Sequence, residues 1–532
     1  MKRIKKLFSW LDKHILELLS GLLLVFIPLY PKWPLLDVLP GYIVRLRLED
    51  FLIAGVLAVF LVQLLRKKVS VRENPLALPI LLYLGIGLLS SISALFITKT
   101  VPLERIHVAK LFLHWARRVE YMSLAFVFFS ALKTTRQVRR MVTILALVMV
   151  TITLYGFGQK YFQWPVYSTM NREFAKGWRL VLTENARVPS TFAGHYDFAA
   201  YNVIILAVLA GLMFHGSKAR VSKIIIIVFI AGFASLLLTA SRTSFIAYLV
   251  AVSVVIFALS FRYSLKWAAT RWVGFVALSL IGMLFFGDLS QRFEHFLKLG
   301  RIKDYIAFEI LNLKSQEQEK VSQTQVSQDL ALVYTETDQP PIPAEPVELP
   351  PGVFEYIPEA FPEATLSADA GPEVATLVGK PRTYSPAAFT FGLSSAIRFD
   401  ALWPRAWKGF LRNPLLGTGY STLTKTQLTE FTEAESTDND FLRALGETGI
   451  LGFMSFFGIL GFALVTLWKK RKAIEDPFLF ALTTGIGGAI VGMLVNGLYI
   501  DVFEASKVAY TFWAMMGILF ASIRIATKKS VK

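Results

Sequence analysis

The fold of this 532-residue chain is decided by the stretch Asp438-Asn439-Asp440-Phe441-Leu442-Arg443-Ala444-Leu445-Gly446-Glu447-Thr448-Gly449-Ile450-Leu451-Gly452. This stretch places carboxylates and an amide where a long polar segment passes into a glycine-spaced apolar run. Chemistry at a membrane surface needs that arrangement, with titratable groups on the water side held by the start of a helix. A soluble linker would not need the apolar run, so the stretch predicts a membrane protein with a site at its surface.

The composition of the whole chain indicates a polytopic membrane protein. Hydrophobic residues make up 54% of it, aromatic residues 14% and charged residues only 18%, which is far more apolar than a globular protein of this length. A helix needs roughly 20 apolar residues to cross a bilayer. Runs that can meet this requirement number twelve, near residues 15–31, 51–65, 76–97, 113–132, 141–158, 197–214, 223–240, 243–261, 268–286, 449–467, 478–498 and 508–524. We therefore predict an all-α fold with about twelve transmembrane helices.

The basic residues alternate along the chain in a way that predicts its orientation. Four Lys or Arg occur in each of three predicted inside segments, residues 66–75, 133–140 and 469–472. The short predicted outside loops hold far fewer. This positive-inside pattern predicts that both termini are cytoplasmic. The formal charge of +18 is otherwise typical of nucleic-acid binding, but the basic residues flank apolar runs and form no single patch. We therefore expect a lipid bilayer and no nucleic acid as partner.

The sequence contains no motif that indicates a bound metal or cofactor. The chain has no Cys, and its six His residues show neither an HExxH motif nor paired metal spacing. We therefore expect no metal and no cofactor.

Two of the predicted outer segments are long and polar. The first, residues 159–196, lies within the part that holds helices one to nine, residues 1–286. The second, residues 287–448, precedes the last three helices in residues 449–532. Within it, residues 315–382 hold ten Pro, twelve acidic and three basic residues, a composition typical of a disordered insert.

A helical pattern resumes after this insert. It begins at Ala396, continues through Trp403 and Trp407, and stops at Asn413-Pro414. We expect a short amphipathic helix that lies at the membrane surface.

Four groups of motifs follow one another along the chain. They are Arg187 with Thr191-Phe192; Leu238-Thr239-Ala240-Ser241-Arg242; Arg398 through Trp407 with Pro414-Leu415-Leu416-Gly417-Thr418-Gly419; and Asp438-Asn439-x-Phe441-Leu442 with Glu447-Thr448-Gly449-Ile450-Leu451-Gly452. Together with the twelve-helix topology they resemble the O-antigen ligase and polymerase superfamily of bacterial membrane glycosyltransferases. The resemblance implies a multi-pass protein of the bacterial cytoplasmic (inner) membrane with an external, periplasmic active face. It also implies an undecaprenyl-pyrophosphate-linked glycan donor, a glycan or lipid acceptor, and a role in polysaccharide assembly.

One position departs from the ligase pattern. Ligases of this family resemble His-Asn-x-x-Leu here, with the His thought to accept the acceptor's proton, and this chain has Asp438 instead. Polymerase-like members more often resemble Asp-Asn, which favours a glycan polymerase. A ligase that transfers glycan to a lipid or protein acceptor is one alternative. A small-anion transporter is another, although the ionisable clusters lie at the outer face and not at the midplane.

Arginines are the candidates for contact with the donor. Transfer from a lipid-linked pyrophosphate requires that charge on the departing oxygens be neutralised, and a guanidinium stays ionised and forks onto two phosphate oxygens. Arg242 is the catalytic candidate at the outer end of an apolar helix, with simple snorkelling as the alternative. The resemblance adds Arg187 and Arg398 as candidates for binding pyrophosphate or glycan. Both lie in polar loops, and without the resemblance an exposed arginine in such a loop would be ordinary.

Two further arginines lie within the fourth predicted helix. Arg117 and Arg118 are expected in its outer third, with His114 and Glu120 close enough to pair with them on one helical face. Pyrophosphate binding and a structural ion pair explain these two arginines equally well.

Asp438 is the candidate general base, next to Asn439 as a candidate substrate contact. An unperturbed Asp has a pKa of about 3.9, against about 6.5 for His, but burial beside Asp440, Glu435 or Glu433 would raise it. The alternative is that Asp438 is a helix N-cap. Glu447 is expected to be structural, beside glycines that allow close contact between helices.

Reporter fusions test the predicted orientation. Reporters fused after Lys68, Arg139 or Lys470 should be cytoplasmic, and those near Arg187 or Gln339 external, because basic loops stay inside. Paired reporters that are active on opposite sides of the membrane measure this. An external signal at Lys470 would contradict the outer position of the site.

Overall fold

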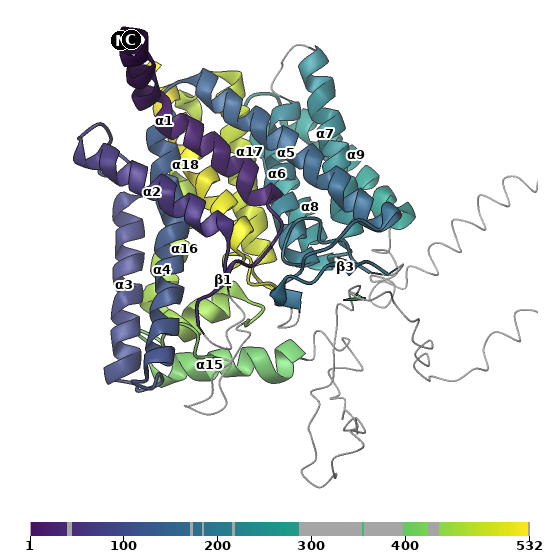
Figure 1. The fold of residues 1–532 in the computed structure, drawn as a ribbon. Coiled ribbons are helices and arrows are strands. Elements are labelled where there is room, and N and C mark those ends of the chain that lie inside the picture. Colours follow the sequence, from purple (N-terminus) through teal and green to yellow (C-terminus); the bar gives the residue numbers. More distant parts are fainter. Residues whose placement is uncertain are drawn as a thin grey trace, which may run out of the picture.

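The computed structural model describes residues 2–39, 45–170, 174–183, 186–214, 219–286, 354–355, 397–423 and 436–529. Helices dominate these residues (Figure 1): α1 (Lys2–Leu29), α2 (Leu48–Leu65), α3 (Ala77–Phe96), α4 (Arg105–Ala131), α5 (Thr135–Phe162), α6 (His195–Met213), α7 (Ala219–Leu238), α8 (Arg242–Leu259), α9 (Leu265–Phe285), α15 (Trp403–Arg412), α16 (Asp440–Lys470), α17 (Pro477–Asn496) and α18 (Ser506–Lys529). Among the described residues, nine helices are long and apolar enough to cross a membrane, namely α2, α3, α5, α6, α8, α9, α16, α17 and α18. A mostly helical fold with several candidate membrane spans is thus confirmed. The count of twelve crossings stays a prediction that also needs α1, α4 and α7.

Short strands and single turns complete the described structure. β1 (Leu36–Asp37) pairs with β2 (Arg45–Leu46) in antiparallel fashion, and β3 (Leu180–Val181) pairs in parallel with β4 (Phe354–Glu355). Single helical turns are η1 (Phe174–Lys176), η2 (Arg398–Leu402) and η3 (Arg471–Ala473). Apart from β4, the predicted insert at 315–382 lies outside the described residues.

Several helices extend beyond their apolar runs because polar residues cap them. α5 begins at Thr135, six residues before the apolar run predicted at 141. Thr134 accepts a hydrogen bond from the Gln137 N–H, and the Gln137 side chain accepts one from the Thr134 N–H. This capping box satisfies N–H groups that the first helical turn leaves without partners. An apolar run therefore marks the part of a helix that can lie in the hydrocarbon of the membrane. The capping residues determine where the helix begins.

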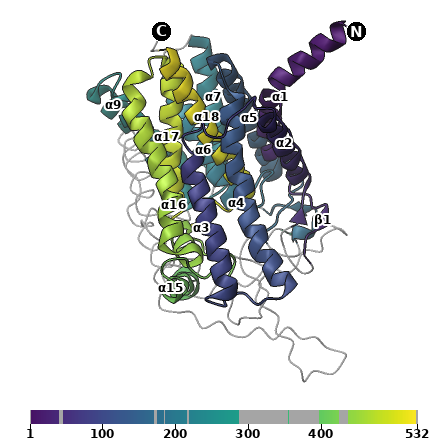
Figure 2. The ribbon, with the colours of Figure 1, turned by 90° about the vertical axis from the view of Figure 1, so that its left-hand side faces the viewer.

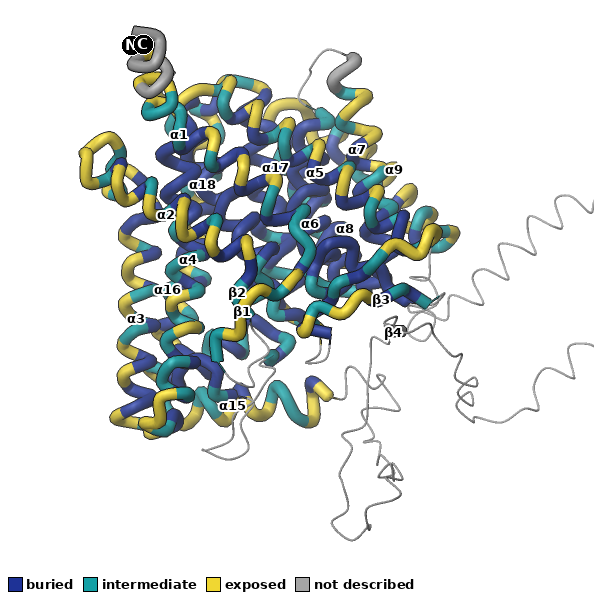
Figure 3. Tube along the Cα trace, viewed as in Figure 1, coloured by how far each residue is buried: buried dark blue, intermediate teal, exposed yellow. Residues whose placement is uncertain are grey.

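The helices α6, α17 and α18 form the centre of the bundle (Figure 3). α17 packs against α6 and α8, and α18 packs against α4. The helices around them expose apolar side chains, for example Leu78 and Leu82 on α3 and Leu278 and Phe285 on α9. Exposed apolar faces on outer helices are what contact with lipid tails requires.

The two ends of the bundle differ. Both chain termini lie at one end, and α15 lies across the opposite end (Figures 1 and 2). We call the end that carries α15 the outer end, in line with the predicted topology. α15 follows the single turn η2 and ends at Arg412, with Asn413 as its C-cap, which matches the expected amphipathic segment.

α16 is broken near its outer end, and the segment after α15 packs into the break. Gly449 has φ of 65° and ψ of −168° inside this helix. The Ile450 N–H donates to the Pro414 carbonyl oxygen at 2.8 Å, and the Gly419 N–H donates to the Glu447 carbonyl oxygen at 2.9 Å. A Cβ on Gly449 would lie 2.4 Å from the Leu415 carbonyl carbon. The start predicted at residue 449 is therefore the position of this break, and the helix itself begins at Asp440.

Substitution of Gly449 tests the importance of this break. Gly449→Ala should lower the free energy of unfolding by about 3 kcal/mol or more, because it adds a Cβ both at positive φ and against backbone. Thermal unfolding of the purified protein in one detergent measures this.

Gly458→Ala is the matched control on the same helix, since a Cβ there would meet no atom within 4 Å. It should be neutral or stabilise the helix by about 1 kcal/mol. Equal unfolding temperatures for the two variants would contradict this account of the break.

Candidate active site

The turn before α16 presents a carboxylate to the outer side. Asp438 has φ of 51°, so the chain turns sharply there, and its side chain is 30% exposed. Its Oδ2 lies 2.9 Å from Nη2 of Arg398, and its Oδ1 accepts a hydrogen bond from Ser436 Oγ at 2.6 Å. Two of the predicted site residues, Asp438 and Arg398, are thus in direct contact.

Arg398 reaches Asp438 from the opening turn of the α15 segment. It is the first residue of η2, a turn of π-helix, a local distortion that is frequent at functional sites. Its side chain is only 5% exposed, and its guanidinium lies 4.5 Å from the centre of the Tyr499 ring. The carboxylate and the aromatic face together stabilise this buried cation.

Asn439 caps α16. Its Oδ1 accepts hydrogen bonds from the N–H groups of Phe441 at 3.0 Å and Leu442 at 2.9 Å, and its Nδ2 donates to the Leu498 carbonyl at 3.0 Å. The alternative that Asp438 caps the helix is wrong, because Asn439 is the cap and the Asp438 carboxylate faces Arg398. Both polar side-chain atoms of Asn439 bond within the protein, so in this geometry it positions Asp438.

The pKa of the Asp438 carboxyl lies above its ordinary value. Burial raises it by disfavouring the charged form, Arg398 opposes this, and the charge of Asp501 adds to the rise. Of the neighbours expected to act here, Glu433 and Glu435 lie outside the described residues. Asp440 is buried, and its carboxylate accepts the Val502 N–H at 3.0 Å. A raised pKa favours a role as proton acceptor.

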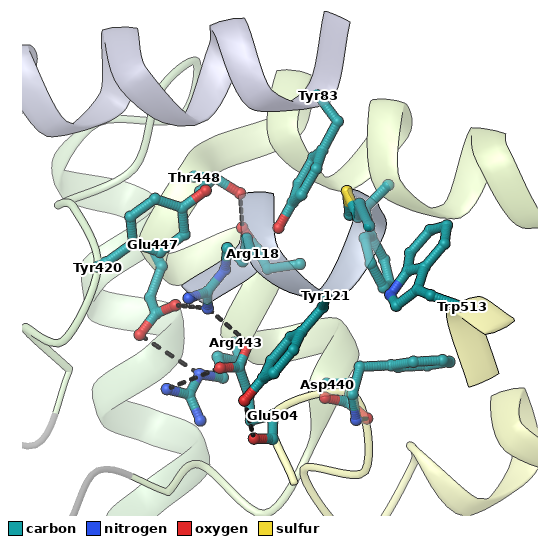
Figure 4. Close-up of a pocket in the computed structure, with 14 residues that line it drawn as sticks. Tyr83, Arg118, Tyr121, Tyr420, Asp440, Arg443, Glu447, Thr448, Glu504 and Trp513 are labelled. Carbon is teal, nitrogen blue, oxygen red and sulfur yellow. Dashed lines mark hydrogen bonds and ion pairs between the residues drawn. The ribbon is translucent and has the colours of Figure 1, made fainter. Parts of the chain in front are cut away.

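A cluster of buried ion pairs lies beneath this turn (Figure 4). Arg118 Nη2 lies 3.3 Å from Glu447 Oε2 and 2.5 Å from Glu504 Oε1. Arg443 Nε lies 3.4 Å from Glu447 Oε1, and its Nη1 lies 3.0 Å from Asp501 Oδ2. These pairs join α4, α16 and the loop between α17 and α18. Each charge is paired, as burial of charge demands.

The pocket among these charges is too small for a sugar. Its volume is about 30 Å³, and Tyr83, Tyr121, Tyr420 and Trp513 complete its walls (Figure 4). That volume holds about two water molecules, whereas ligand pockets commonly exceed about 300 Å³. The cluster therefore fixes the outer turn from inside the protein, which agrees with the structural role expected for Glu447.

Arg117 and Arg118 both occur in ion pairs. Arg117 Nη1 lies 2.5 Å from Asp50 Oδ1 and 2.9 Å from Glu120 Oε2. Glu120 was the expected partner, whereas the partners of Arg118 come from distant parts of the chain. The ion-pair alternative accounts for both arginines.

Arg187 lies just before α6. Its Nη1 is 2.7 Å from His195 Nε2 and 3.1 Å from the Tyr196 hydroxyl. The motif that follows is tied to α18, because Lys507 Nζ donates to the Thr191 carbonyl at 2.7 Å. Arg187 is buried.

Arg242 is the first residue of α8 and is partly exposed. Two residues on, Ser244 Oγ donates to Asn496 Oδ1 at 3.2 Å. The next residue, Gly497, accepts the Asp440 N–H through its carbonyl at 2.8 Å. These bonds bring the start of α8 to the start of α16, so Arg242 lies at the same end of the bundle as Asp438.

Sequence reasoning missed the loop between α17 and α18. Asp501 and Glu504 in this loop contact the residues around Asp438. The available signal was the presence of two carboxylates in the short outer loop between two strongly apolar runs. Within the described residues, no group of three or more His, Asp or Glu side chains could hold a metal ion.

The O-Antigen ligase family matches residues 225–457, from α7 through the break in α16. The matched range contains Arg242, Arg398, Asp438, Asn439 and Glu447. The resemblance to the O-antigen ligase superfamily is therefore confirmed. No curated protein matches the chain.

The match to this superfamily fits the fold. Its members are glycosyltransferase-like enzymes that process membrane glycans in ligase or polymerase reactions, and their substrates are lipid-linked. Together with the nine candidate spans of the described residues, the O-antigen ligase domain indicates a multi-pass bacterial membrane protein.

Proposed function

We propose that this protein is a glycan polymerase that acts on oligosaccharide linked to undecaprenyl pyrophosphate at the outer face of the cytoplasmic membrane. The observation that carries the proposal is the pair of Asp438 and Arg398, in which a partly exposed carboxylate replaces the family's His. The O-antigen ligase domain supports transfer of a lipid-linked glycan. Asp in place of His favours the polymerase over the ligase.

In the proposed reaction, an acceptor sugar hydroxyl attacks the anomeric carbon of the donor. The carbon–oxygen bond to pyrophosphate breaks, and its electron pair stays on the departing phosphate oxygen. Asp438 takes the hydroxyl proton as the glycosidic bond forms. Since pyrophosphate is already a good leaving group, the protein chiefly supplies positioning, charge neutralisation and the base.

Arg398 and Arg242 are assigned the charge neutralisation, without a metal. Arg398 holds the Asp438 carboxylate at 2.9 Å in this structure, which supports its ability to hold a phosphate oxyanion. A donor phosphate that binds Arg398 would compete with Asp438 for the guanidinium and release the carboxylate as a base. Arg242 would contact the same anion from the start of α8.

The other candidate residues receive secondary roles. Arg187, buried beside His195, is proposed to contact the donor glycan. Asn439, Arg117 and Arg118 are proposed to support the site from within, because their polar atoms form the cap and the ion pairs described above.

A ligase is the second candidate, because the matched family is described as O-Antigen ligase. It would use the same donor, base and arginines, and would differ in the acceptor. Cellular glycans distinguish the two. Loss of a polymerase leaves single repeat units on the acceptor, whereas loss of a ligase leaves the extended ladder on its lipid carrier.

Asp438→Asn tests the base assignment in cells that lack the wild-type protein. Asn keeps the size of the side chain but cannot take up a proton at neutral pH, so glycan extension should fall by about 100-fold or more with normal expression. Gel separation of extracted surface polysaccharide measures the ladder.

Asp37→Asn is the control, since it makes the same change at an exposed carboxylate that pairs with Arg45. This variant should extend glycan normally. A full ladder from Asp438→Asn would refute Asp438 as the base.

A further inference from the structure

We propose that Asp501 positions Asp438 as proton acceptor, through the N–H groups on both sides of Asp438 and through the hydroxyl of Ser436. This inference rests on the proposed function, because it concerns Asp438 as proton acceptor. It adds a positioning residue that lies outside the matched family range of residues 225–457.

The Asp501 carboxylate clamps the turn that carries Asp438. Its two oxygens accept the N–H groups of Thr437 and Asn439, each at 2.8 Å. Arg443 Nη1 donates to it at 3.0 Å from the first turns of α16. The N–H groups on both sides of Asp438 are therefore fixed to one side chain, which is itself only 8% exposed. This clamp holds the backbone of Asp438 in its left-handed conformation.

A single hydroxyl links the two carboxylates. Ser436 Oγ lies 2.6 Å from Asp438 Oδ1 and 3.0 Å from Asp501 Oδ2. A serine hydroxyl has one hydrogen to donate and can also accept. When both carboxylates are ionised, it can donate to only one of them. When Asp438 carries a proton, Asp438 donates to Ser436 Oγ and the Ser436 hydrogen turns to Asp501. While Asp438 is ionised, the hydrogen bond from Ser436 favours its charged form.

The charges around Asp438 act in opposite directions. Arg398 and Arg443 favour the ionised form of Asp438, and Asp501 favours the protonated form. Asp501 itself accepts hydrogen bonds from the N–H groups of Thr437 and Asn439 and from Arg443. The charge of Asp501 therefore favours retention by Asp438 of a proton taken from the acceptor oxygen. Without the charge of Asp501, the effect of Arg398 and Arg443 would favour the ionised form of Asp438 more strongly.

The test is the pH dependence of glycan transfer by the purified full-length protein in lipid nanodiscs, with a synthetic polyprenyl-pyrophosphate oligosaccharide as donor. Asp501→Asn should lower kcat by about tenfold or more and change the donor KM little, because the base and not the donor contact is altered. The acid limb of the rate profile should move to lower pH by about one unit, since loss of the Asp501 charge lowers the proton affinity of Asp438.

Ser436→Ala separates the bridge from the clamp, because the N–H bonds to Asp501 remain. It should shift the acid limb to higher pH, because the Asp438 carboxylate loses a hydrogen-bond donor that favours its ionised form. The loss of rate should be smaller than in Asp501→Asn. Asp476→Asn is the control: Asp476 accepts two N–H groups as the cap of α17, and its replacement should leave the profile unchanged.

Wild-type acid limbs in both Asp501→Asn and Ser436→Ala would overturn the proposal and reduce Asp501 to a structural residue. If Asp501→Asn fails to fold, the acid limb of Ser436→Ala alone decides between these results. Failure of the proposed function would appear differently, as full activity of Asp438→Asn in the same assay.

Discussion

A set of buried ion pairs joins α4, α16 and the loop between α17 and α18, and the geometry of the outer turn depends on it. Arg118 and Arg443 share Glu447 and Glu504, so each cation has partners on elements far apart in the sequence. A buried charge that loses its partner costs about 3–5 kcal/mol. The three elements can therefore satisfy all of these charges only in one relative arrangement, and that arrangement places Asp501 beside the residues that precede α16.

The break in α16 adds the second half of the site. Because Gly449 lets the helix open its backbone to the segment after α15, α15 lies across the outer end of the bundle, and Arg398 at the start of this segment reaches Asp438. Exposure then increases outward, from buried Arg118 in the small pocket to the partly exposed carboxylate of Asp438. The buried charges around Arg118 thus stabilise the structure, whereas the Asp438 carboxylate is exposed enough for an acceptor to reach.

Composition and apolar runs predicted the helical membrane fold. Each of the twelve runs overlaps a helix of the structure and extends at most two residues beyond its ends. They missed the polar beginnings of helices such as α5, because hydropathy does not register caps. The sequence also singled out Asp438 and Arg398, but not their contact. Asp438 and Asn439 are equally good caps by residue type, and Asn439 takes this role because Asp501, some 60 residues later in the chain, fixes the backbone on both sides of Asp438. Long-range partners of this kind, like those of Arg118, have no local sequence pattern.

The central claim is that the Asp438 carboxylate accepts the acceptor's proton, and chemical rescue tests it most directly. The measurement is the initial rate of glycan transfer by purified Asp438→Ala, with and without added formate, a carboxylate small enough to enter a partly exposed site. The account predicts a rate about 100-fold or more below that of the wild type, with partial recovery that increases with formate concentration. A wild-type rate from Asp438→Ala without formate would contradict it.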